Sequence, residues 1–118
     1  MGNQIAILHL RPHGYLHAAA FNEIAVGLKA GFSELGYTAS ISENKIIPKA
    51  RHIVLGGHLL DAAGLSNLPE DTVIFNFEQL SQTNWTMTAS YRQALTRFEV
   101  WDYSERNIDN LFSFINFN

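Results

Sequence analysis

The segment RPHGYLH, residues 11–17, places several side chains capable of acid–base chemistry directly after an apolar run. Histidine titrates near neutral pH, so His13 would suit a general base that takes a proton from a hydroxyl group. A loop histidine that caps a helix or faces water is the alternative. The spacing of His13 and His17 is compatible with metal binding on a helix, but Gly14 and the lack of a third nearby ligand argue against a metal site. The candidate residues of this segment are Arg11, His13, Tyr15 and His17.

Polar groups also follow two later apolar runs, VIFNFEQ and VWDYSERN. Glu78 and Asp102 are candidate acids, although each carboxylate can alternatively pair with an arginine or cap a helix. The candidate ligand-binding residues after these runs are Asn76, Gln79, Tyr103, Ser104 and Asn107.

A third apolar run ends in Gly56, Gly57 and His58. Backbone N–H groups of a glycine pair can approach an anion, but the rest of a phosphate-binding fingerprint is missing. A tight turn with positive φ explains the two glycines more simply.

The apolar runs must be positioned by regular elements. Apolar runs and alternation predict strands over residues 4–10, 37–42, 51–57, 72–78 and 99–103. Helical periodicity and capping residues predict helices over residues 17–36, 58–65, 88–97 and 105–114. Gly36 is expected to stop the first helix, and Ser104 to cap the last one. The expected packing positions near the third helix and the fifth strand are Ala89, Leu95, Phe98 and Trp101.

This order of elements predicts one α/β domain over residues 1–118, a Rossmann-like three-layer sandwich with a largely parallel sheet of about five strands. Near-continuous apolar strands agree with this fold, because helices cover both faces of such a sheet. In an open parallel sheet, ligands bind beyond the carboxyl ends of the strands. The polar clusters described above are therefore expected to line one edge.

Composition excludes several classes of function. A net charge of −3 and a pI near 5.9 provide no positive field for nucleic acid, which we do not expect as a partner. The absence of cysteine excludes disulfides and thiolate chemistry and favours a cytoplasmic location. No apolar run approaches the roughly 20 residues that span a bilayer. The Phe-rich tail, LFSFINFN, would form an edge strand, a homodimer contact or a contact with a further domain.

Four segments together resemble the amino-terminal, Rossmann-like half of a family of bacterial GT-B-like glycosyltransferases. They are GYLHAAAFNE, IVLGGHLL, LPEDTVIFNFEQL and YRQALTRFEVWDYSERNI, and they span nearly the whole chain. The resemblance has one departure at position 77, where Phe77 stands in place of the leucine of the family. The resemblance implies that this half receives a sugar acceptor, with a base at His13, assisted by an acid. It implies functional roles for His17, Asn76, Glu78, Gln79, Asp102, Tyr103, Ser104 and Asn107.

In such enzymes a second domain holds the nucleotide sugar, and the reaction takes place between the two domains. No counterpart of that domain is expected within these 118 residues, so catalysis by this chain alone is not expected. No cofactor is expected either. Two other functions stay open: a non-catalytic module that binds a sugar or nucleotide, and a protein-interaction module that docks through its tail.

Overall fold

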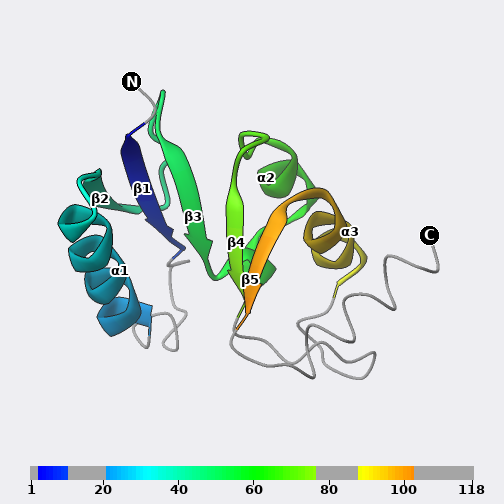
Figure 1. Ribbon diagram of the computed structural model, residues 1–118. Coiled ribbons are helices and arrows are strands. Elements are labelled where there is room, and N and C mark those ends of the chain that lie inside the picture. Colours follow the sequence, from blue (N-terminus) through cyan, green and yellow to red (C-terminus); the bar gives the residue numbers. More distant parts are fainter. Residues whose placement is uncertain (1–2, 11–20, 77–87, 103–118) are drawn as a thin grey trace.

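A computed structural model describes residues 3–10, 21–76 and 88–102 of the chain. They form one sheet of five parallel strands in the order β2-β1-β3-β4-β5 (Figure 1). The prediction of a Rossmann-like α/β fold with a parallel sheet is therefore confirmed. The strands are β1 (Gln4–His9), β2 (Thr38–Glu43), β3 (Arg51–Leu55), β4 (Val73–Asn76) and β5 (Glu99–Asp102).

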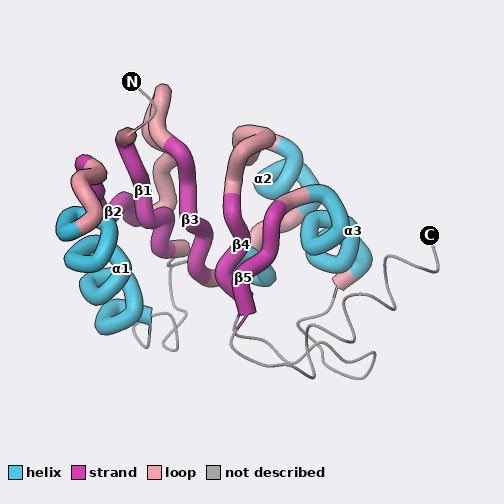
Figure 2. Tube along the Cα trace, viewed as in Figure 1, coloured by secondary structure: helices cyan, strands magenta, loops and turns pink. Residues whose placement is uncertain are grey.

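Helices lie on both faces of the sheet, which gives the expected three layers (Figure 2). One face packs against α1 (Asn22–Glu34). The other face packs against a second group of helices. That group contains the short 3₁₀ helix η2 (Gly57–Leu59), α2 (Ala62–Ser66) and α3 (Ala89–Arg97).

Alternation along each strand divides the core between these two faces. Ile5 and Ile7 of β1 pack on the α1 side, whereas Leu8 packs on the side of α2 and α3. Ile53 and Val54 of β3 are divided in the same way. Because both faces are covered, residues 5–8 of β1 and 53–55 of β3 are all apolar, and the sequence shows continuous runs there rather than an alternating pattern.

The carboxyl end of α1 is stopped by Gly36, as predicted. Gly36 has φ of 94°, a left-handed conformation that glycine adopts at little cost. Its N–H donates to the Ser33 carbonyl at 3.1 Å, and the N–H of Tyr37 donates to the Phe32 carbonyl at 3.0 Å. The rings of Phe32 and Tyr37 also meet edge to face, 5.6 Å apart, which is the apolar contact typical of this helix ending.

Helices α2 and α3 on the other face begin at side-chain caps. The Asp61 carboxylate accepts a hydrogen bond from the Gly64 N–H at 2.8 Å and caps α2. The Thr88 hydroxyl accepts from the Tyr91 N–H at 3.1 Å and caps α3. Helix α3 buries Tyr91, Ala94 and Leu95, whereas Ala89, an expected packing position, is exposed on the first turn.

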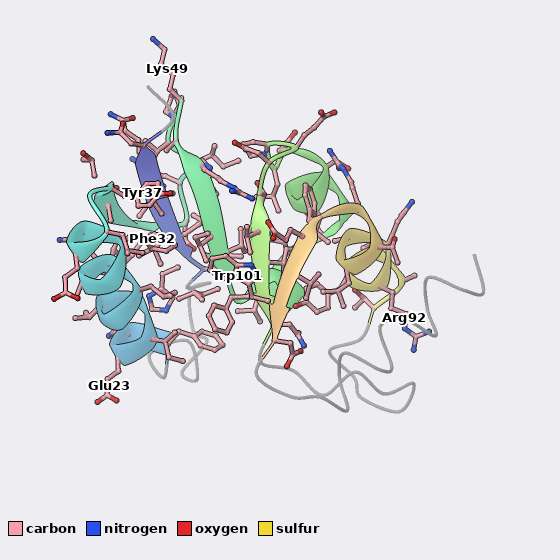
Figure 3. All side chains as sticks on the ribbon, in the orientation of Figure 1. Glu23, Phe32, Tyr37, Lys49, Arg92 and Trp101 are labelled. Carbon is pink, nitrogen blue, oxygen red and sulfur yellow. The ribbon has the colours of Figure 1, made fainter. Side chains whose placement is uncertain are left out.

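Trp101 was expected in the core but is only half-buried, because β5 is the edge strand of the described sheet. Its ring stacks on Phe32 of α1, with centroids 6.3 Å apart and planes at 18°, and meets the edge of Phe75 (Figure 3). Trp101 thus connects β5 with the α1 layer. Across the described residues, no helix combines the length and the apolar character needed to cross a bilayer.

Candidate functional site

The carboxyl ends of all five strands lie at one edge of the sheet, because every neighbouring pair is parallel. The chain leaves β1 toward β2 on the α1 side and leaves β3 toward β4 on the other side. The boundary between β1 and β3 is therefore the topological switch point, where doubly wound sheets bind their ligands. Of the sequence-predicted residues, this edge carries Gly56 and Gly57 after β3, Asn76 at the end of β4 and Asp102 at the end of β5.

Asn76 and Asp102 are neighbours in register on the side of the sheet that faces α3. The Asn76 side-chain nitrogen donates to the Asp102 carboxylate at 2.8 Å. The Asn76 side-chain oxygen accepts from the Tyr91 hydroxyl of α3 at 2.7 Å. Asn76 is completely buried and Tyr91 nearly so, whereas Asp102 is partly exposed. The polar residue that interrupts the apolar run of β4 therefore links the helix layer to a carboxylate at the sheet edge.

This chain of hydrogen bonds fixes the orientation of the Asp102 carboxylate. Tyr91 occupies the acceptor of the Asn76 amide, so the amide nitrogen is directed at Asp102. A hydrogen bond from an amide to a carboxylate is charge-assisted and stronger than a bond between neutral groups, and a partly buried bond of this kind is stronger than an exposed one. A positioned, accessible carboxylate at a sheet edge can accept hydrogen bonds from hydroxyl groups of a ligand, as acidic residues do for ribose in other doubly wound sheets.

Gly57 makes room for Tyr91. A Cβ atom at Gly57 would lie 3.2 Å from Cε1 of the Tyr91 ring, with Val54 and Ile74 also close by. The Tyr91 ring thus packs against the backbone of η2 at Gly57, and its hydroxyl donates to Asn76. The structure gives Gly57 a packing role in support of the Asn76–Asp102 pair.

The replacement Gly57→Ala is expected to lower the free energy of unfolding by about 1–2 kcal/mol, because the new methyl group overpacks the Tyr91 ring. Gly27→Ala is the matched control, since a Cβ at Gly27 in α1 meets nothing within 4 Å. There the same change should raise stability by up to about 1 kcal/mol through helix propensity. Urea denaturation of both variants measures the two effects. Equal shifts in one direction would contradict the packing role of Gly57.

Gly56 supplies the turn that leaves β3. Its φ of 85° lies in the left-handed region, and a Cβ there would approach Leu59 and Leu10 at 3.3 and 3.4 Å. The turn therefore requires glycine for its conformation and for its close contact with the end of β1. For Gly56 this agrees with the simpler explanation of the glycine pair, a tight turn with positive φ, whereas Gly57 does not have a positive φ.

His9 and Tyr91 are residues of this region that the sequence-based reasoning did not select. His9 is fully buried at the carboxyl end of β1, beside the switch point, and its ring meets the edge of Phe21 with centroids 6.1 Å apart. The signal for His9 was a polar residue inside an apolar run, the same signal that marked Asn76. Tyr91 gave no comparable signal, because a tyrosine in an amphipathic helix usually fills core.

The structure describes only part of the remaining predicted site residues. His58 lies in η2, and its backbone alone is described. Nine predicted residues lie outside the described part of the chain, so their roles stay predictions. These are Arg11, His13, Tyr15, His17, Glu78, Gln79, Tyr103, Ser104 and Asn107.

A surface hollow of about 350 Å³ lies between α2 and α3. Its lining includes Leu65, Ser90, Arg97 and Phe98, and none of its lining residues belongs to a strand end of the candidate site. The hollow is thus part of the helix layer. Within the described ranges, no three histidine, aspartate or glutamate side chains converge into a metal-binding group.

Comparison of the chain with models of known protein families, with curated proteins and with solved structures finds no significant match. The fold and the geometry of the sheet edge therefore carry the functional argument.

Proposed function

We propose that this chain is the acceptor-side half of a GT-B-like sugar transferase and binds a sugar or nucleotide sugar at the carboxyl edge of its sheet. The observation that carries this proposal is the Asp102 carboxylate, held at that edge by Asn76 and Tyr91. The parallel α/β fold is compatible with a nucleotide-binding domain. The sugar-transfer part of the proposal rests on the sequence resemblance.

In this proposal Asp102 accepts hydrogen bonds from ligand hydroxyls and fixes their position. Positioning accounts for a large share of catalysis in reactions that join two bound molecules. A base, for which His13 is the predicted residue, would take the proton of the attacking hydroxyl as the nucleotide leaves the donor sugar. The second domain of the family would hold that donor, so this chain alone is expected to bind ligand without turnover.

Isothermal titration of the purified chain with uridine- and guanosine-diphosphate sugars and with free hexoses tests the proposal. Asp102→Asn should weaken binding by about tenfold or more, because a hydrogen bond to a charged group contributes roughly 1.5–3 kcal/mol. The variant keeps an oxygen that can accept from Asn76, so the fold is expected to persist.

Glu99→Gln is the matched control at the opposite end of the same strand. Glu99 pairs with Arg51 at 2.7 Å, and both side chains are about half exposed, so losing the pair has little effect on stability. Ligand affinity should be unchanged in this variant. If both variants weaken binding equally, or if no compound of the panel binds, the proposed site is wrong. A monodisperse chain that binds no sugar but self-associates through its tail would instead favour the interaction module.

A further inference from the structure

A second buried histidine, His52, lies far from the proposed site, near the amino end of β3. Its Nε2 accepts a hydrogen bond from the Ile47 N–H at 2.9 Å. Ile47 belongs to residues 44–50, the segment that joins β2 to β3 and is here called the β2–β3 connection. A strand side chain therefore holds the backbone of a connecting segment.

The β2–β3 connection is unusually short for a crossover between two parallel strands. Because β1 lies between β2 and β3, the connection must cross one strand, and parallel crossovers usually need a dozen or more residues and a helix. Here seven residues cross β1 without a helix. Asn44 and Lys49 adopt positive φ angles of 60° and 69°, which cost energy for residues other than glycine.

Hydrogen bonds attach this strained segment at its start and in its middle, and within it the Ala50 N–H donates to the Ile47 carbonyl at 3.4 Å. At its start the Asn44 N–H donates to the His9 carbonyl at 3.3 Å, and the Ser42 hydroxyl donates to the Lys45 carbonyl at 2.5 Å. The bond from Ile47 to His52 fastens its middle to the sheet. The connection thus depends on His52 for its central attachment.

The attachment requires a neutral ring. Nε2 can accept a hydrogen bond only when it carries no proton, so Nδ1 carries the hydrogen of neutral His52. Nδ1 is buried, and among the described residues no hydrogen bond to it meets the usual distance and angle limits. Burial lowers the pKa of His52, while the charge of Asp71 and the Ala50 backbone oppose this effect.

We propose that His52 is a pH-sensitive latch: its neutral ring holds the β2–β3 connection, and protonation of Nε2 replaces the acceptor by a donor and releases the connection. When Nε2 of His52 is protonated, its N–H and the Ile47 N–H are two hydrogen-bond donors that face each other. Asp71, and Glu70 beside it before β4, favour the positive ring. Burial disfavours it. The other charged residues of the neighbouring sequence are Lys45 and Lys49 of the connection and Arg51 on β3.

Hydrogen exchange of the full chain, measured by mass spectrometry, tests the latch. After correction for intrinsic exchange rates, peptides covering residues 44–50 should lose protection on acidification from about pH 7.5 to about pH 5. The loss should grow by up to tenfold for each pH unit between the ordinary histidine pKa of about 6.5, which applies to the released ring, and the lower pKa of the attached ring, and it should level off below that lower pKa. Peptides covering β4 should keep their protection, because the opening is local. In the NMR spectrum, the Ile47 amide shift should follow the titration of the His52 ring.

His52→Gln is the informative variant, since a glutamine oxygen can accept from the Ile47 N–H and does not titrate in this range. Its connection should show no pH response. Three results would overturn the latch: equal protection of residues 44–50 at both pH values, loss of protection that spreads equally to β4, or a pH response that persists in the variant. If the variant does not fold, an Ile47 amide that ignores the His52 titration in the native chain has the same consequence.

Discussion

Replacing Tyr91 by alanine is expected to lower the free energy of unfolding by about 4 kcal/mol, the largest effect of any change considered for this protein. Tyr91 is 1% exposed and packs within the core cluster between the sheet and α3. Its removal leaves a cavity and also deprives the Asn76 side-chain oxygen of the Tyr91 hydroxyl. Urea denaturation monitored by circular dichroism measures the loss as a lower midpoint.

Tyr91→Phe separates the two contributions. The phenylalanine ring keeps the packing against Gly57 and loses only the hydroxyl, so the expected loss is about 1–2 kcal/mol, the cost of leaving a buried acceptor without this donor. If Tyr91→Phe costs as much as Tyr91→Ala, packing is not the main contribution. If it costs nothing, the hydrogen bond to Asn76 does not stabilise the fold.

Asn76→Asp should give the second-largest effect, and one that depends on pH. The change is nearly isosteric and keeps an oxygen that can accept from the Tyr91 hydroxyl. It replaces the amide that donates to Asp102 at 2.8 Å by a second carboxylate, which places two negative charges in contact. We expect a loss of about 2–3 kcal/mol at neutral pH, from the lost charge-assisted bond and the repulsion.

The sign of the pH dependence follows from proton linkage. Repulsion from the Asp102 carboxylate favours the protonated form of the new carboxyl group, so its pKa in the folded protein lies above its unfolded value of about 3.9. The folded state then binds more protons than the unfolded state, and stability falls as pH rises through the folded pKa. Unfolding midpoints at about pH 5 and about pH 7 should therefore show the variant closer to the native protein at the lower pH. A deficit that is equal at both values would contradict a close contact between positions 76 and 102.

The sequence was sufficient to predict the sheet. Continuous apolar runs marked β1, β3 and β4 because both faces of each strand are buried, and Gly36 marked the end of α1 because only a left-handed residue completes that helix ending. These are local signals, and each stands in a few consecutive residues. The parallel direction followed from the alternation of strands with helices.

The contacts that define the candidate site were harder to predict, because they join residues far apart in the chain. Asn76 and Asp102 were selected as single residues, but their contact depends on the register of β4 with β5. Tyr91 was missed, because its hydroxyl reaches Asn76 only after α3 packs across Gly57. Similarly, nothing in the sequence around His52 indicated that its ring would hold the β2–β3 connection.

The central claim is that ligand binds at the carboxyl edge of the sheet, beside Asp102. A titration of the ¹⁵N-labelled chain with a free hexose as the acceptor sugar, followed through backbone amide shifts, tests it most directly. The largest shifts are expected to cluster at Leu10, Gly56, Asn76 and Asp102, and to disappear in Asp102→Asn. Shifts that cluster instead at the amino ends of the strands, around Arg51, Thr72 and Glu99, would contradict it.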